Sequence, residues 1–479
     1  MKRIAVNCGV TPPTPFHTPT CTHSYNNRSS RLKLFASSWL PHYYHATRDH
    51  NNTFIASASS VSGSEQLLDV GSKKKRREIA GIDQDELVDP KLLADPDSCF
   101  CEFKGVHIHH KIYDFESNSK EQTVLQNQAL VSNQINKLCL PMILLHGFGA
   151  SVFSWKRVMK PLAEATCSKV LAFDRPAFGL TSRVNLSSAT GDAKPLNAYS
   201  MAFSVLATLH FFDLLKAEKA ILVGHSAGSS VAVKTYFEAP ERVAAIILIA
   251  PAIFAPLTTP KVVKENQPRQ DNEMKEDSGS IRKNPFVELY TSLSKIIKNV
   301  AMTITKMMKP MIDFLNSLYR KLLSAILLSS PAIMLVRMAI DKFGTAAVRN
   351  SWYDPKQVSE HVLSGYTKPL RVKDWDRALV EFTAAALLDE EPNTKPALSK
   401  RLGEISCPVL IVTGDSDRIV PAWNAERLSR VIPGASLEVI KQCGHLPHEE
   451  KVEEFISIVE NFLRKLAGDS NEQYLQPAV

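Results

Sequence analysis

The sequence predicts an α/β fold with a mostly parallel, doubly wound sheet that is covered by helices on both faces. Short continuous apolar runs, such as Leu138–Leu145, Lys169–Phe173 and Val243–Ile249, are typical of strands buried on both faces. Segments with helical periodicity, such as Tyr199–Leu215, alternate with these runs. Strands that alternate with helices form parallel sheets, because each helix crosses back over one face of the sheet.

The same patterns predict the other elements of the sheet and its cover. Lys104–Asp114 alternates apolar and polar residues and is predicted to be the first strand. The other predicted strands are Ala220–Val223, Val409–Val412 and Ala435–Ile440, and the other predicted helices are Ser151–Ala165, Ala227–Glu238 and Val452–Leu466.

No metal site and no cofactor are expected. His107, His109 and His110 lie in the first predicted strand, and a half-exposed strand explains them without a metal ion. Eight cysteines in 479 residues do not make a disulfide scaffold. Cys99 and Cys101 are close together, but no second Cys or His pair follows them at zinc-like spacing, so we expect reduced structural thiols.

The segment Gly224–Gly228 has the pattern G-x-S-x-G, with a predicted strand before it and a predicted helix after it. In this context the serine occupies a sharp turn that needs small flanking residues and that lifts its hydroxyl above the sheet. Ser226 is therefore the predicted nucleophile. The N–H of Ala227 begins the following helix, where it can face a developing oxyanion.

The segment His146–Gly149 follows an earlier buried strand, where a second oxyanion donor is expected. We assign this donor to the backbone N–H of Phe148. His146 and His225 are interpreted as residues that pack the loops, since neither occupies the position of a catalytic base.

The base and its carboxylate partner are predicted from the ends of the last two strands. His445 follows the last strand and is the predicted base, and Asp417 is the carboxylate that would orient it. Asp415 competes for this role, but it directly follows Gly414 and is more typical of a turn. The chain order of serine, aspartate and histidine is the order typical of one hydrolase fold.

These motifs together resemble the α/β-hydrolase superfamily, over roughly residues 100–466. The resemblance rests on Gly224–Gly228, His146–Gly149, Gly414–Pro421 and Gly444–Glu450. It implies the α/β-hydrolase fold. About 150 residues separate the predicted strand that ends at Ile249 from the one that starts near Pro408, and because so long a connection is uncommon without structure of its own, we predict a large helical lid inserted between core strands. Epoxide hydrolases and haloalkane dehalogenases carry Asp at the nucleophile position, so Ser226 argues against their chemistry.

Within this superfamily the chain is similar to plant plastid-targeted serine hydrolases. The resemblance implies esterases that act on lipid-like or prenyl esters, such as the phytyl ester of chlorophyll. Some chlorophyll-acting relatives carry Pro-Gly where this chain has His146 and Gly147, which leaves the substrate open.

The net charge of +8 is concentrated near the N-terminus. Residues 1–60 carry six basic residues against the single acid Asp49, and the run Lys73–Arg77 adds five more. The rest of the chain therefore has a slight negative balance, and no nucleic-acid partner is expected. The run Lys73–Arg77 is compatible with a nuclear signal or with a solvated linker.

Residues 1–58 have the composition of an organelle transit peptide, rich in Ser with scattered Arg and almost no acid. The chloroplast is the expected destination and the mitochondrion the second choice, with Ile55–Ser59 as the processing zone. The alternative is a disordered cytosolic tail.

The predicted boundaries divide the rest of the chain into five parts. Residues 59–97 form a polar linker with one short helix around Glu86–Leu93, residues 98–251 and 403–467 form the core, 252–402 form the lid, and 468–479 form a disordered tail. Within the lid, residues 261–283 are charged and poor in large apolar residues and are predicted to be disordered, whereas 286–395 are predicted to be helical.

Apolar residues recur at steps of three or four from Phe286 to Leu322. Four lysines lie on the opposite face, namely Lys295, Lys298, Lys306 and Lys309. The helix 286–309 is therefore compatible with peripheral contact to an anionic membrane, or with packing on the body as the roof of the site. The segment Leu322–Val336 contains Pro331 and falls short of the ~20 residues that span a bilayer, so no transmembrane helix is predicted.

The predicted activity is hydrolysis of a small hydrophobic carboxylic ester through an acyl-enzyme on Ser226. Two alternatives stay open. One is the use of the same triad for C–C bond hydrolysis or a lyase reaction. The other is a ligand-binding receptor or scaffold that retains the triad, although a pure binder has no need of all three residues.

Overall fold

The computed structural model describes residues 77–115, 139–184, 196–255, 314–388 and 397–473, with a few further positions between 294 and 311. The predicted transit peptide, most of the basic run and the segment 261–283 lie outside the described residues and stay predictions.

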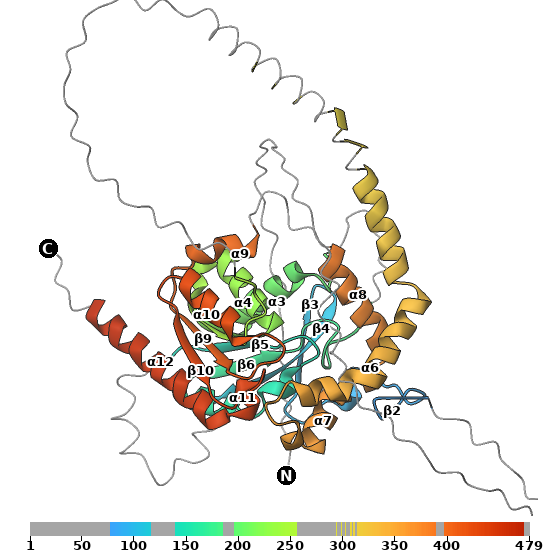
Figure 1. The fold of residues 1–479 in the computed structure, drawn as a ribbon. Coiled ribbons are helices and arrows are strands. Elements are labelled where there is room, and N and C mark those ends of the chain that lie inside the picture. The colour runs from blue at the N-terminus through green and yellow to red at the C-terminus, as the bar shows by residue number, and fades with distance from the viewer. Residues whose placement is uncertain are drawn as a thin grey trace, which may run out of the picture. The chain divides into compact units, whose positions relative to one another are not determined.

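Eight strands of the described residues form one sheet in the order β10-β9-β8-β7-β5-β6-β4-β3 (Figure 1). The parallel strands are β5 (Met142–Leu145), β6 (Lys169–Phe173), β7 (Ala220–His225), β8 (Val243–Ile249), β9 (Val409–Gly414) and β10 (Ser436–Ile440). At one edge, β3 (Cys99–Phe103) and β4 (Val106–Asp114) run antiparallel to their neighbours. The predicted α/β fold with a mostly parallel sheet is confirmed.

Different helices cover the two faces of the sheet. One layer contains α3 (Met201–Leu214), α4 (Ala227–Glu238) and α10 (Ala422–Val431), and the other contains α2 (Met159–Thr166) and α12 (Val452–Gln473). Successive side chains of β5 alternate between the layers: Ile143 and Leu145 pack in the first, and Met142 and Leu144 in the second. Burial on both faces explains why these strands are continuous apolar runs.

Several boundaries differ from the predictions. The helix predicted over Ser151–Ala165 is interrupted, because Ser151 caps a 3-10 turn, η2 (Val152–Trp155), before α2 begins. The strand β3 was not predicted. The tail predicted to be disordered from residue 468 is helical as far as Gln473, where α12 ends.

The last 21 positions of the linker predicted over 59–97 are described, and the short helix predicted around Glu86–Leu93 is present over Pro90–Leu93. This segment holds the short antiparallel pair β1 (Glu78–Ile79) and β2 (Ile82–Asp83) and a 3-10 helix, η1 (Pro90–Leu93). Leu93 is buried against Val372 of the insertion. Single apolar residues without periodicity gave no signal for this contact.

The insertion between β8 and β9 is helical where it is described. It contains a helix over Phe314–Leu327, then α6 (Ser330–Asn350), α7 (Glu360–Thr367), α8 (Trp375–Leu388) and α9 (Leu398–Arg401). No single helix among the described residues is both long and apolar enough to cross a membrane, while Phe314–Leu327 and α6, which meet at 55°, meet the length and composition criteria as a bent pair. Most of the predicted helix 286–309 lies outside the described residues.

Candidate active site

The residues predicted to carry the chemistry follow the carboxyl ends of neighbouring parallel strands. Ser226 follows β7, Asp417 follows β9 and His445 follows β10. This edge is where open α/β sheets bind their ligands. All three side chains are buried, with Ser226 the most exposed of them at 9%.

Ser226 sits in a strained turn between β7 and α4. Its φ of 50° and ψ of −117° lie in a region that residues with a side chain rarely adopt. A Cβ at Gly228 would collide with the backbone of Leu145, and a Cβ at Gly224 would lie 2.6 Å from the Cα of Ser229. The chain can fold back this sharply only because both flanking positions are glycine. The turn leaves Ser226 at the N-terminus of α4, beside the N–H of Ala227.

The structure brings Asp417 and His445 together. His445 Nδ1 donates to Asp417 Oδ2 over 2.7 Å, and the other carboxylate oxygen accepts from the N–H groups of Ile419 and Val420 at 2.8 and 2.9 Å. A donating Nδ1 leaves Nε2 as the nitrogen that can accept a proton. Asp415 instead accepts from Ser416 Oγ at 2.9 Å and stabilises the turn after β9.

Both backbone groups of His445 are held. Its N–H donates to the carbonyl of Ser351 over 2.7 Å, and its carbonyl accepts from His225 Nε2 at 3.0 Å. His225, interpreted from the sequence as a packing residue, therefore positions the backbone of the base. Its ring lies 4.8 Å from the ring of His445, between centroids.

The lid insertion contributes further contacts to the loops that carry the acid and the base. Glu450 accepts from the N–H of Gly444 at 2.8 Å and from the N–H of Tyr353 at 2.7 Å. Arg418, next to Asp417, donates to the carbonyls of Trp352 and Tyr353 at 3.3 and 3.2 Å. The start of the lid segment after α6 is thus bonded to both catalytic loops. Sequence reasoning missed this, because the contacts span 65 residues or more of the chain.

His146 fixes the orientation of the peptide that carries the Phe148 N–H. His146 Nε2 accepts from the N–H of Arg175 at 3.0 Å, so Nδ1 carries the proton and donates to the carbonyl of Gly147 at 2.7 Å. In a trans peptide, this carbonyl and the N–H of Phe148 point in opposite directions, and no cis peptide bond is present. His146 thereby has a more specific role than packing.

Burial keeps the neighbouring histidines neutral. Burial and the charge of Arg175 lower the pKa of His146 to about 4. Burial and the charge of His445 lower the pKa of His448 to about 3, and burial also places the pKa of His225 well below its usual range. At neutral pH these side chains add no positive charge beside His445.

Aromatic side chains surround the predicted oxyanion loop. The ring of Phe148 is 58% exposed and contacts Phe178 and Phe382, with centroids 5.4 and 6.1 Å away. The buried guanidinium of Arg175 lies over Phe178 and Phe382, at 5.5 and 5.6 Å from their centroids. Because Phe382 belongs to α8, the lid supplies part of this apolar surface.

A second contact joins the lid to the loop that follows His445. The Tyr366 hydroxyl of α7 bonds to the buried Glu449 carboxyl of α11 (Pro447–Glu450). Burial raises the pKa of Glu449 to about 8, although the bond to Tyr366 and the charge of Arg157 act in the opposite direction. A Cβ at Gly365 would collide with the ring of Phe153, so this glycine lets α7 approach the body closely.

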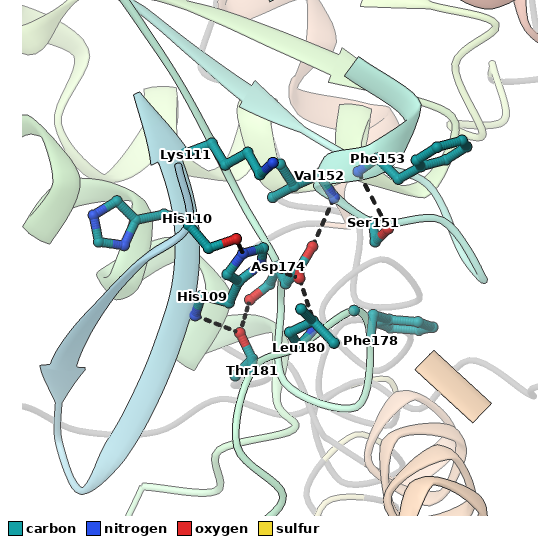
Figure 2. A network of polar contacts seen from close by, with 12 residues as sticks. His109, His110, Lys111, Ser151, Val152, Phe153, Asp174, Phe178, Leu180 and Thr181 are labelled. Carbon is teal, nitrogen blue, oxygen red and sulfur yellow. Dashed lines mark hydrogen bonds and ion pairs between the residues drawn. The ribbon is translucent and has the colours of Figure 1, made fainter. Parts of the chain in front are cut away.

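Figure 2 shows another buried histidine–aspartate pair, formed by His109 and Asp174. His109 Nδ1 bonds to Asp174 Oδ2 at 2.7 Å, and Asp174 also accepts from the N–H groups of Val152 and Leu180 at 2.6 and 2.7 Å. The predicted half-exposed strand is therefore wrong at His109 and His110, which are buried, while His107 is exposed. Among the described residues no group of His, Cys, Asp or Glu side chains could hold a metal ion.

The strained serine, the carboxylate-bound histidine and the glycine-flanked turn define the class of serine-type hydrolases with an α/β sheet. A family model for the α/β hydrolase family matches residues 142–458, more than half of the chain. The protein belongs to the α/β hydrolase family.

Two hydrolases are similar to about two thirds of this chain. The 2-hydroxy-6-oxononadienedioate/2-hydroxy-6-oxononatrienedioate hydrolase of Klebsiella pneumoniae is 26% identical, over 68% of this chain and 87% of its own length. The 2-hydroxy-6-oxo-6-phenylhexa-2,4-dienoate hydrolase of Comamonas testosteroni is 25% identical over the same shares. The crystal structure of a meta-cleavage product hydrolase from Pseudomonas fluorescens is 18% identical, with a TM-score of 0.45, and covers 77% of this chain and 97% of that one.

Proposed function

We propose that this α/β hydrolase cleaves a hydrophobic carboxylic ester through an acyl-enzyme on Ser226. Asp417, His445 and Ser226 act as acid, base and nucleophile, and the N–H groups of Phe148 and Ala227 bind the oxyanion. The observation that carries the proposal is the combination of the strained Ser226 at the start of α4 with the 2.7 Å bond between His445 and Asp417.

In the first half-reaction, the Ser226 hydroxyl gives its proton to His445 Nε2 while its oxygen bonds to the ester carbonyl carbon. The carbonyl oxygen becomes an oxyanion, which the two backbone N–H groups stabilise. Asp417 stabilises the imidazolium and holds Nδ1 as a donor. The intermediate collapses, the C–O bond to the alcohol breaks, and His445 returns its proton to the leaving alcohol.

In the second half-reaction, a water molecule replaces the alcohol. His445 removes a proton from the water, whose oxygen attacks the acyl carbon. Collapse of the second intermediate breaks the bond to Ser226, which recovers its proton from His445, and the carboxylic acid leaves.

A hydrophobic substrate is supported by the side chains beside Phe148. The exposed ring of Phe148 presents apolar surface next to the predicted oxyanion donor, and it packs against the buried ring of Phe178 and the partly buried ring of Phe382. Apolar pockets gain free energy with each buried methylene, about 0.8 kcal/mol in transfer terms. We therefore expect kcat/KM to rise with acyl chain length.

The test is a panel of p-nitrophenyl esters from acetate to longer acyl chains, assayed with wild type and with Phe382→Ala. Wild type is expected to prefer longer chains, and Phe382→Ala to lose part of that preference while it keeps acetate turnover. Absence of turnover of every ester by folded wild-type protein would contradict an esterase.

The second candidate is hydrolysis of a C–C bond with the same residues. It is favoured by the relatives that are named as hydrolases of 2-hydroxy-6-oxo dienoate compounds. The two candidates separate in one assay, because a 2-hydroxy-6-oxo-6-phenylhexa-2,4-dienoate substrate is coloured and its cleavage can be followed directly. Turnover of this compound without turnover of any ester would select the second candidate.

We also propose that residues 1–58 direct the protein to the chloroplast, with the mitochondrion as the second destination. The support is the Ser-rich, acid-poor composition of the segment. A fluorescent protein fused behind residues 1–60 should enter plastids of plant cells. Uniform cytosolic fluorescence would contradict import.

A further inference from the structure

The helix pair Phe314–Leu327 and α6 presents a large apolar surface that no described residue covers. Eleven large apolar side chains between residues 314 and 343 are exposed, among them Phe314 at 66%, Met334 at 61% and Phe343 at 64%. α6 has no buried residue along its 21 positions. Contiguous apolar surface of this kind marks a site of interaction with a membrane or a protein.

Within the pair, α6 is attached to the body by residues along its length. Arg337 of α6 forms a 2.6 Å ion pair with Asp376 of α8, and Asp341 accepts from the N–H of Ala80 at 2.9 Å. Val348, near the end of α6, packs against the cluster that holds Trp352 and Leu446. These contacts hold α6 to the body, while Met334, Leu335, Met338 and Phe343 stay exposed.

Basic residues are interleaved with the exposed apolar residues. Between 314 and 350 the sequence has five basic residues against the single acid Asp341, and two of the five, Arg337 and Arg349, form ion pairs with Asp376 and Glu360. Lys321 follows Leu318 by three positions and Lys342 follows Met338 by four, so each lysine lies beside an exposed apolar side chain on the same face. Long lysine side chains can keep their charge in water while their stems cover apolar surface.

We infer that this helix pair is a peripheral docking surface for an anionic lipid bilayer. Charge selects this occupant: the surface is both apolar and basic, and anionic lipid headgroups lie directly above an apolar layer. A second copy of the chain would bring two basic faces together, which repel each other. The bend of 55° and Pro331 at the start of α6 suit helices that lie in the interface.

The surface adjoins the segment that contacts the catalytic loops. α6 ends at Asn350, and the carbonyl of the next residue, Ser351, accepts from the N–H of His445. If the proposed function holds, a lipid-derived ester would reach the site from the bilayer. Binding of the surface to lipid does not depend on that function.

The test is co-sedimentation of the full chain with vesicles of phosphatidylcholine alone or mixed with phosphatidylglycerol. Wild type should bind the mixed vesicles. Leu318→Glu/Leu322→Glu should lower partitioning by at least about tenfold, because two leucine side chains that would enter the bilayer are lost. Leu92→Glu is the matched control, because Leu92 is 77% exposed outside the pair. Circular dichroism verifies that each variant is folded.

The charge component has its own variant. Lys321→Glu/Lys342→Glu should lower binding to the mixed vesicles about tenfold and leave the weak binding to pure phosphatidylcholine unchanged. Added salt should weaken wild-type binding in the same direction.

Three results would overturn the inference. The first is equal binding by wild type and Leu318→Glu/Leu322→Glu. The second is a wild-type protein that does not bind vesicles but forms a dimer, where the leucine variant is a monomer. That result would assign the face to a second copy. The third is retention of wild type in the membrane after an alkaline carbonate wash, which would mean that the pair is embedded and not peripheral.

Discussion

The molecule contains two buried histidine–aspartate pairs with the same geometry and different surroundings. His445–Asp417 and His109–Asp174 both have 2.7 Å between Nδ1 and Oδ2. His109 Nε2 also lies 2.9 Å from the hydroxyl of Ser98, which completes a hydrogen-bonded row of serine, histidine and aspartate. Residue types and distances alone would assign catalysis to either pair.

The serines differ in backbone and setting. Ser226 has a positive φ and begins α4, whereas Ser98 precedes the strand β3 and accepts from the N–H of Asp95 at 3.1 Å, as in an ordinary turn. Asp174 also binds the N–H groups of Val152 and Leu180, so it ties together the loops after β5 and β6. A nucleophile is therefore distinguished by its strained turn at a helix N-terminus, where backbone donors face the oxyanion.

The largest expected effect separates the two serines. Ser226→Ala should lower ester turnover by on the order of 10⁴–10⁶, because the nucleophile is lost. Ser98→Ala should keep kcat within about threefold of wild type, since Ser98 lies in a turn before a strand and not at the N-terminus of a helix. The measurement is kcat with a p-nitrophenyl ester. Wild-type turnover by Ser226→Ala would show that Ser226 is not the nucleophile.

The two carboxylates that follow β9 should also differ in their effect on kcat. Asp417→Asn should lower kcat by about 10⁴, because an amide favours the wrong tautomer of His445. Asp415→Asn should have a far smaller effect, since Asp415 bonds to Ser416 and not to the histidine. Steady-state kinetics of both variants decide between them, and a crippled Asp415→Asn would reassign the acid.

The second pair should respond in stability. His109→Ala leaves the buried carboxylate of Asp174 without its imidazole partner, and we expect a loss of about 2–4 kcal/mol in the free energy of unfolding. The folded fraction should keep its rate of labelling by a fluorophosphonate. His445→Ala is the opposite case, with labelling lost. Urea denaturation and labelling kinetics give the free energy of unfolding and the labelling rate of both variants. A His109→Ala variant that is stable but not labelled would assign catalysis to His109.

A pH dependence of stability is expected at the lid contact beside His445. The pKa of Glu449 is about 8 in the folded protein against an ordinary 4.5. Between these values the unfolded chain has lost the proton that the folded chain keeps, so the free energy of unfolding should fall as pH rises from 4.5 to 8, by at most about 1.4 kcal/mol per pH unit.

Glu449→Gln should remove this slope, because the amide stays neutral at every pH. Glu453→Gln is the control. Glu453 is exposed and lies four residues after Glu449, so this variant should keep the wild-type slope. Thermal unfolding at several pH values measures the effect. A slope that survives in Glu449→Gln would assign it to other groups.

Much of this architecture could be predicted from the sequence. β6, α4 and β8 have the predicted bounds, because continuous apolar runs and helical periodicity report local burial. Ser226 was predicted because the G-x-S-x-G pattern encodes a backbone turn that only small neighbours permit.

The remaining features depend on contacts between distant parts of the chain. β3 is a five-residue strand defined by its pairing with β4, and its sequence has no clear alternation of burial. The bonds from Ser351 and Tyr353 to the His445 loop join residues more than 90 positions apart, and no local sequence pattern predicts them. The structural role of His109 was missed because its partner, Asp174, lies 65 residues away.

Labelling by a fluorophosphonate tests directly whether Ser226, and not Ser98 with its bond to His109, is the nucleophile. The full chain is labelled with a fluorophosphonate, digested and mapped by mass spectrometry. We expect a single adduct on the peptide that contains Ser226, and we expect this adduct to be lost in both His445→Ala and Asp417→Asn. An adduct on Ser98, or a folded wild-type protein that carries no adduct at all, would contradict it.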